Sequence, residues 1–199
     1  MKEKVHIVRY KKDLRMADHK PLYEACQQDL PVVALYVWEP KMMQHADYSH
    51  FHQYRIQESL KDLSHSLRKI NIPLLMWHGG VEEILTLIQK YYEITHIYAH
   101  EETGNNLTYL RDIGIMKYCQ NNMITYTEYP TNAVVRRLAD RDMWDKIWKE
   151  RIHSEIVPTP SACTLYAIDA GLLEKAKKSF YSFVPAMKPA ACGSAQDMP

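Results

Sequence analysis

The sequence predicts an α/β fold, a doubly wound sheet of five parallel strands with helices on both faces, followed by a helical C-terminal extension. Two observations lead to this prediction. Short apolar runs rich in β-branched residues alternate five times with longer segments whose apolar residues recur every three or four positions. Right-handed crossovers between parallel strands then restrict the chain to a doubly wound order, so the sheet is expected to be Rossmann-like.

The five strands follow from composition. The first is centred on Val5, Ile7 and Val8 and is expected to lie in the middle of the sheet. The other four are expected within residues 32–37, 72–80, 94–100 and 123–129. Helices are expected at residues 19–28, 51–70, 81–92 and about 107–119. Asp18 is the expected N-cap of the first helix, with Pro21 in its first turn, and residues 41–50 are expected to be a polar surface loop.

Beyond Pro130 the chain changes character. Residues 1–135 are predicted to form the α/β domain, and residues 136–199 a helical linker with a loosely held tail. Trp144 and Trp148 lie four residues apart in a segment with partial helical spacing, and a short helix is expected near residues 170–180.

Composition excludes several classes of function. Lys+Arg 25 against Asp+Glu 24 gives a net charge of +1, which neither attracts nor excludes nucleic acid. DNA binding would need a local basic patch or another domain, so no direct DNA binding is expected. The four cysteines are widely spaced, which favours free thiols in a cytoplasmic protein, and the ten histidines show no metal-ligand spacing. No signal peptide or membrane span is indicated.

The loop after the first strand is the first half of the expected binding crevice. It contains no glycine, so neither a GxGxxG nor a GxxxxGK[ST] motif supports ordinary nucleotide binding. Two interpretations are open for Lys11, Lys12 and Arg15. In the first, these residues contact the phosphate of a cofactor. In the second, they belong to a solvated loop in which Asp13 and Arg15 pair, and this interpretation is favoured because exposed basic residues are common.

The loop after the fourth strand is the second half. Its polar residues either bind the ring or ribose of a cofactor, or form a turn around Gly104. They are Glu101, Glu102, Thr103 and Asn105. Trp38 and Trp77 lie at strand ends, where each could stack on a chromophore. Packing in the core is the favoured interpretation, because it is more usual for large aromatic residues. No catalytic or metal-binding residue is indicated. The candidate cofactor-binding residues are Tyr10, Lys11, Asp13, Arg15, Trp38, Glu101, Glu102 and Asn105.

Two motifs resemble a known family. The strand followed by KKDLR and ADHKPLYEA resembles the RRDLR and HDNPAL signature of the photolyase/cryptochrome flavoproteins. The segment HEETGNNLTYLRD, which ends in Arg111 and Asp112, resembles a turn of the same family, although less specifically. The resemblance covers residues 1–135 and continues less surely through RRLADRDMWDKIWKERI.

The resemblance implies an antenna domain that binds a second chromophore and passes excitation energy to FAD in a separate helical domain. Leu107 and Thr108 stand where folate-binding members have an Asn-Glu pair, so a flavin or deazaflavin is favoured over folate. DNA docking, FAD binding and reversal of pyrimidine dimers belong to the helical domain, which would begin about where this chain ends. The expected role is therefore support of light-driven repair, without repair activity alone, and whether the chain itself is an enzyme stays open.

Two other hypotheses remain. In the first, the chain is a stand-alone interaction module without a cofactor, and its face around Trp144 and Trp148 self-associates or binds a helical FAD domain. A nucleotide-binding protein with the same type of sheet is the third, weakened by the glycine-free first loop. The sequence leaves open whether the chain is a fragment or a natural short protein.

Overall fold

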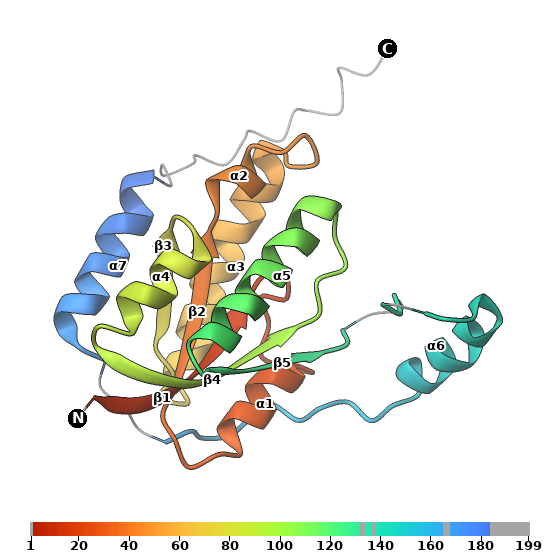
Figure 1. Ribbon diagram of the computed structural model, residues 1–199. Helices are drawn as coiled ribbons and strands as arrows, with labels where there is room; N and C mark the ends of the chain where they lie inside the picture. The colour runs from red at the N-terminus through yellow and green to blue at the C-terminus, as the bar shows by residue number, and fades with distance from the viewer. Residues whose placement is uncertain (1, 132–133, 137, 165–167, 184–199) are drawn as a thin grey trace, which may run out of the picture.

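A computed structural model describes residues 2–131, 134–136, 138–164 and 168–183. Its five strands are all parallel and lie in the order β3-β2-β1-β4-β5 (Figure 1). The strands are β1 (Glu3–Tyr10), β2 (Val32–Trp38), β3 (Leu74–His78), β4 (Tyr92–His100) and β5 (Thr125–Tyr129). The first strand lies in the centre, between β2 and β4, so the predicted fold class and the predicted place of this strand are confirmed.

Seven α-helices are described. They are α1 (Lys20–Cys26), α2 (Pro40–Met43), α3 (His50–Arg68), α4 (Val81–Ile88), α5 (Asn106–Asn121), α6 (Trp144–Ile152) and α7 (Ala170–Phe183), with a 3-10 turn at Arg141–Met143. The four helices expected between strands are present with somewhat different ends. The short α2 lies in a segment expected to be a loop, and Pro40 starts it because proline is already set to a helical φ at the first position of a helix.

The core lies on both faces of the sheet because side chains alternate along each strand. On one face, Val5 and Ile7 of β1 pack with the buried residues of α4 and α5. On the other face, Val8 and Tyr10 of β1 pack with those of α1 and α3. Trp38 and Trp77 are both buried, as core packing predicts.

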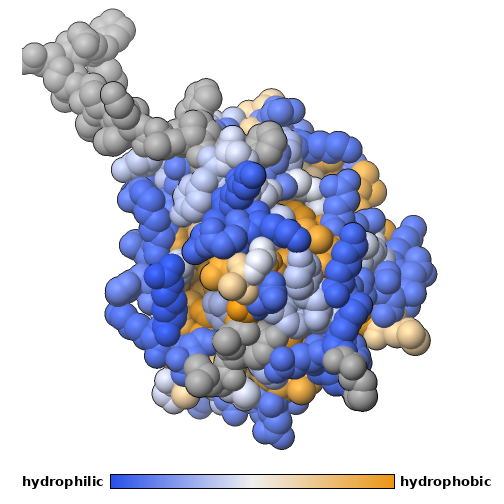
Figure 2. Space-filling view, turned by 90° about the vertical axis from the view of Figure 1, so that its left-hand side faces the viewer, coloured by the Kyte–Doolittle hydropathy of each residue, from blue (hydrophilic) through white to orange (hydrophobic). Residues whose placement is uncertain are grey.

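The C-terminal extension completes this core. Leu172, Ala176 and Phe180 follow one another at four-residue spacing along α7 and are all buried, and α7 lies against β3. Figure 2 views this side of the molecule and shows hydrophobic residues surrounded by hydrophilic ones. Part of the segment predicted as linker is therefore packed on the sheet, whereas the predicted loose end, residues 184–199, lies outside the described residues.

The start of α1 corrects one prediction. The N-cap is His19, whose ring accepts a hydrogen bond from the Leu22 N–H, and Pro21 lies in the first turn as expected. Asp18 instead has a φ of 51° and exchanges two hydrogen bonds with Val157, one from its own N–H and one to its carboxylate. A residue in this left-handed conformation lies outside the helix, so Asp18 anchors the returning C-terminal segment instead of capping α1.

Helix α6 stands apart from the sheet (Figure 1). Its two tryptophans, Trp144 and Trp148, stack on each other with ring centroids 5.7 Å apart. Cys26, Cys119 and Cys163 are free thiols, as expected, and Cys192 lies outside the described residues. None of the described helices has the length and apolar character needed to cross a bilayer.

Candidate functional site

The carboxyl ends of β1 and β4 bring the two predicted loops together. Asp13, in the loop after β1, accepts hydrogen bonds at one carboxylate oxygen, Oδ2, from His19 Nε2 at 2.9 Å and from His100 Nδ1 at 2.6 Å. All three residues are buried. Burial alone would raise the pKa of Asp13, but the hydrogen bonds and charges of the two histidines outweigh it and hold this pKa well below its usual value. Asp13 is therefore a carboxylate that accepts from both rings.

The capping bond determines the tautomer of His19. Its Nδ1 accepts the Leu22 N–H at 3.1 Å, so its ring proton lies on Nε2 and points at Asp13. Asp13, His19 and His100 lie close enough together to hold a metal ion. Ligation through His19 Nε2 would, however, move the proton to Nδ1, where it would face the Leu22 N–H. Two donors would then oppose each other, so the triad is built for hydrogen bonding.

A second polar cluster lies beneath α5. Arg9 of β1 is 2% exposed and donates to Asp112 Oδ1 at 2.9 Å, while Lys11 donates to Asp112 Oδ2 at 2.7 Å. Asp112 faces the sheet because Thr108, Asp112 and Ile115 form the buried side of α5. Burial would raise the pKa of Asp112, but the neighbouring cations outweigh it and lower this pKa well below its usual range.

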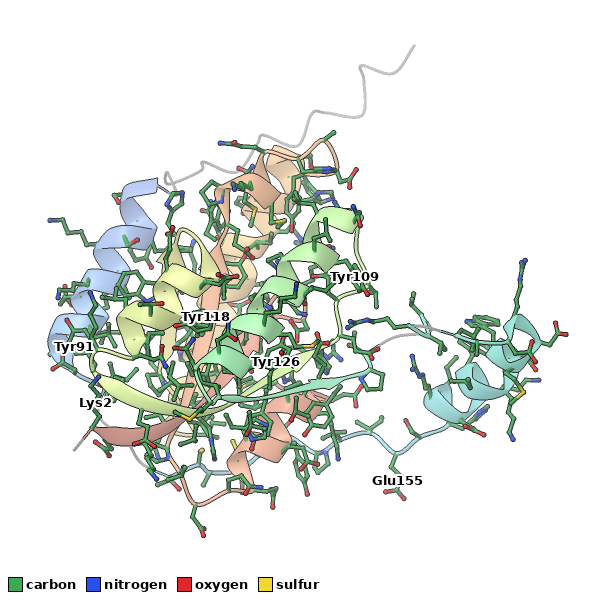
Figure 3. All side chains as sticks on the ribbon, in the orientation of Figure 1. Lys2, Tyr91, Tyr109, Tyr118, Tyr126 and Glu155 are labelled. Carbon is green, nitrogen blue, oxygen red and sulfur yellow. The ribbon has the colours of Figure 1, made fainter. Side chains whose placement is uncertain are left out.

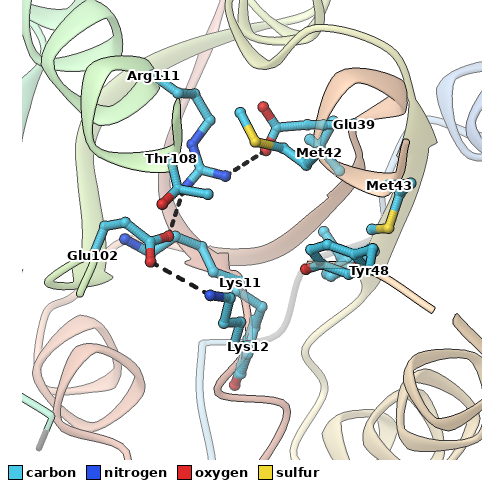
Figure 4. Close-up of a pocket in the computed structure, with 12 residues that line it drawn as sticks. Lys11, Lys12, Glu39, Met42, Met43, Tyr48, Glu102, Thr108 and Arg111 are labelled. Atoms are coloured by element: carbon cyan, nitrogen blue, oxygen red, sulfur yellow. Dashed lines mark hydrogen bonds and ion pairs between the residues drawn. The ribbon is translucent and has the colours of Figure 1, made fainter. Parts of the chain in front are cut away.

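Arg111 extends this cluster across the crevice (Figure 4). Its guanidinium reaches Glu39 at 2.7 Å, Glu102 at 2.7 Å and Asp112 at 2.9 Å. Arg9, Lys11 and Arg111 thus face three carboxylates, Glu39, Glu102 and Asp112. Lys12 adds a fourth basic side chain to this ion-pair network, with its Nζ 3.8 Å from Glu102, so four positive charges face three negative ones and each carboxylate already has a basic partner.

The cavity above the network is small. Its volume is about 30 Å³, which holds a water molecule or two, and its walls include the rings of Tyr10, Tyr36 and Tyr48 beside Met42 and Met43. The Tyr10 hydroxyl is buried without a hydrogen-bond partner among the described residues. A flavin-sized ring does not fit in this closed cavity.

A much larger groove lies on the other side of the same loops. Its volume is about 720 Å³, and it separates the end of β5 and the start of α1 from α6. Glu155, on the segment that returns from α6, borders it (Figure 3). His100, Tyr129 and Trp148 contribute rings to its walls.

The predicted site residues are divided between these regions. Tyr10, Lys11 and Glu102 line the closed cavity, and Arg15 lines the groove. The expected Asp13–Arg15 pair is wrong, because Asp13 bonds the two histidines and Arg15 donates to the backbone oxygens of Ala17 and Asp18.

Two of the remaining predicted residues, Trp38 and Asn105, have structural contacts. Trp38 packs on Phe180 in the core, with ring centroids 6.0 Å apart. Asn105 caps α5 by accepting the Thr108 N–H, and its amide donates to Asp47. Glu101 is partly buried after β4, and its cofactor role, like that of the other seven, stays a prediction.

Sequence reasoning missed several residues of this site. Arg9, His19, Glu39, Tyr36 and Tyr48 were not among the candidates. A charged residue inside a buried strand was the available signal for Arg9, because such a residue requires partners. No local pattern points to Glu39, which meets Arg111 across 72 positions of sequence.

Residues 6–142 match the family described as DNA photolyase. The chain belongs to this family. A cryptochrome DASH of Gloeobacter violaceus is 34% identical over 119 residues, which are 57% of this chain and 24% of that protein. The chain therefore spans only about a quarter of the length of this relative. The first loop and the α5 segment that suggested the resemblance both lie inside the matched region.

Solved structures show the same fold. The Synechocystis sp. cryptochrome matches with a TM-score of 0.69 at 21% identity, covering 87% of this chain and 41% of that one. An archaeal photolyase from Sulfolobus tokodaii, solved with two FAD molecules that implicate a novel light-harvesting cofactor, matches with a TM-score of 0.64 at 20% identity, covering 87% and 41%. The chain thus corresponds to the N-terminal α/β domain of photolyases and cryptochromes.

Proposed function

We propose that this chain is an antenna-type domain that binds a flavin or deazaflavin chromophore at the carboxyl edge of its sheet. The groove beside α6 carries the proposal. Its volume of about 720 Å³ lies within the range of sites that enclose small molecules, and it offers the rings of Tyr129 and Trp148 for stacking. It borders the KKDLR loop, whose Arg15 lies in its wall.

The closed cavity is a poorer site for a chromophore, which supports the choice of the groove. Paired charged side chains surround it and its free volume is about 30 Å³, so a chromophore there would have to displace buried charged groups. The two FAD molecules of the Sulfolobus tokodaii photolyase show that a relative with this fold accommodates more than one flavin.

Support of repair is the wider role proposed. In a protein that also contains a helical FAD domain, excitation of the bound chromophore would assist light-driven reversal of pyrimidine dimers. The described residues offer no group that we assign to the repair reaction, so the chain by itself is proposed to be inactive in repair.

Spectroscopy of the purified chain tests chromophore binding. Titration with riboflavin or 5-deazariboflavin is expected to quench the ligand's fluorescence, and 5,10-methenyltetrahydrofolate is expected to bind more weakly. Trp148→Ala should weaken riboflavin binding about tenfold through lost stacking. Phe51→Ala removes an exposed aromatic ring on α3 outside the groove lining, so it is the control and should leave affinity unchanged. Absence of binding by all three ligands would overturn the proposal.

A second candidate function rests on exposed apolar surface. Nine large hydrophobic residues are exposed among those described, and five lie in one segment. These five are Val134, Met143, Trp144, Ile152 and Ile156. Clustering of this kind is typical of a docking surface, here for a helical FAD domain or a second copy of the chain. Analytical ultracentrifugation tests self-association: a dimer lost in Trp144→Ala would support it, and a monomer at all concentrations would leave the helical domain as the partner to test.

A further inference from the structure

His100 is the residue that connects the hydrogen-bonded triad to the groove. It is 3% exposed, it ends β4, and it lies in the groove wall. Its Nδ1 is held by Asp13 at 2.6 Å, which leaves Nε2 as the ring nitrogen available to the groove. Among the described residues only Nδ1 of this ring makes a hydrogen bond, and Nε2 is not one of the fully buried polar atoms that lack a partner. The nitrogen is therefore accessible from the groove, where a ligand can reach it.

The hydrogen bonds among Asp13, His19 and His100 determine whether His100 Nε2 donates or accepts a hydrogen bond. Asp13 is ionised and accepts from both histidines, and His19 is fixed in one tautomer by the Leu22 N–H. In the neutral His100 ring the proton therefore lies on Nδ1, and Nε2 presents a lone pair. The nitrogen is an acceptor whose direction is set by two buried neighbours, so it selects a ligand with an N–H or O–H donor.

We propose that His100 Nε2 accepts a hydrogen bond from the ring N3–H of a pyrimidinedione, the polar edge shared by flavins and 5-deazaflavins. This inference rests on the proposed function and names the part of the chromophore that the chain recognises. A pyrimidinedione edge presents a carbonyl, an N–H and a second carbonyl in sequence. It requires an acceptor flanked by donors, and His100 supplies the acceptor.

Donors for the two carbonyls are present in the same groove. Arg15 has five N–H donors: it donates to the backbone oxygens of Ala17 and Asp18, and its guanidinium lies 3.9 Å from the Asp18 carboxylate. Lys20 has three donors and is paired with Glu24 at 2.6 Å. Both residues line the groove with His100. Each therefore retains donors beyond its present partners.

The charge of the groove favours recognition of the ring over recognition of a phosphate. Three basic and three acidic side chains line it, so their charges cancel. These residues are Arg15, Lys20, Arg151, Asp18, Glu150 and Glu155. A phosphate would gain little from such a surface, whereas a neutral ring can stack on Trp148 or Tyr129 and direct its N–H to His100.

The experiment compares riboflavin with 3-methylriboflavin, in which a methyl group replaces the N3 proton, and the His100 variant separates the lost hydrogen bond from the added bulk. The full 199-residue chain is expected to bind riboflavin about tenfold more tightly, the usual effect of one hydrogen bond to a buried acceptor. His100→Asn retains an N–H for Asp13 but removes the distal ring nitrogen, so it should bind the two ligands equally. His65→Asn, at an exposed position of α3, is the control and should keep the preference.

The outcomes separate this inference from the proposed function. Equal binding of both ligands by the unaltered chain would overturn the role of His100 while leaving chromophore binding intact. Binding of neither ligand would overturn both. Should His100→Asn fail to fold, equal binding of the two ligands by the unaltered chain would still overturn the role of His100, and His100→Gln is then compared in its place.

Discussion

The closed cavity and the open groove lie at the same edge of the sheet, on either side of the same two loops, yet they differ in the room that they offer a ligand. The cavity holds about 30 Å³ above the ion-pair network, whereas the groove holds about 720 Å³ between the sheet and α6. The basic residue Lys11, for which a phosphate contact was the less favoured interpretation, pairs with Asp112. The charged residue Lys11 at the end of β1 thus has a structural partner. The space for a ligand lies in the groove, where the C-terminal extension forms one wall.

Removing the central carboxylate of the network should have the largest effect. Asp112→Asn leaves Arg9 and Lys11 without their shared partner in a buried position, so the free energy of unfolding is expected to fall by about 3–5 kcal/mol. Urea denaturation measures it, with Asp62→Asn at an exposed position of α3 as control. A loss below about 1 kcal/mol would show that the network does not stabilise the closed cavity.

Acid should act in two separate pH windows. Burial lowers the pKa of His19, on the groove side. Burial and the neighbouring His6 lower the pKa of His96, which lies inside the sheet on β4, from 6.5 to about 4. Because the unfolded chain binds these protons more readily, stability is full above pH 6.5 and is lost as pH falls from 6.5 towards 4. The lowered pKa of Asp112 acts in the other window: its stabilisation is present above the ordinary value of 3.8 and is lost only below it.

The histidine contribution is measurable by urea denaturation at a series of pH values. His96 is about half buried, so its shift is discounted for solvent screening to about 1–2 kcal/mol between pH 7 and pH 4. His96→Gln should reduce the loss in that range and leave the loss below pH 3.8 unchanged. An unchanged slope between pH 6.5 and 4 would contradict the assignment.

The smallest expected effect concerns the Tyr10 hydroxyl in the closed cavity. Tyr10→Phe removes a buried group that has no hydrogen-bond partner, so stability should be unchanged or raised by up to about 1 kcal/mol. Tyr118→Phe, which loses a hydrogen bond of 2.6 Å to Gln89, is the matched control and should lose about 1 kcal/mol. A clear loss in Tyr10→Phe would indicate that water fills the cavity and bonds this hydroxyl.

Local patterns in the sequence were sufficient to predict the fold. The apolar run around Val5 and the alternation of strands and helices predicted the central β1 and the parallel sheet, and the KKDLR and Arg111-Asp112 motifs predicted the family. Each of these signals lies within a few residues of chain, where periodicity and turn chemistry act directly. Helix ends were less well predicted, because the cap of α1 depends on the His19 ring and on the pairing of Asp18 with Val157.

Only the tertiary structure decided the chemistry of the site. The bonds of Asp13 to His100 and of Arg9 to Asp112 join residues 87 and 103 positions apart, and the groove brings Arg15 to the same hollow as Trp148. No spacing rule connects such residues. Their partners depend on which strands become neighbours and on where the extension returns to the sheet, so the sequence alone determined the fold and the family, while the packing of distant segments determined which charges are neutralised and where a ligand has room.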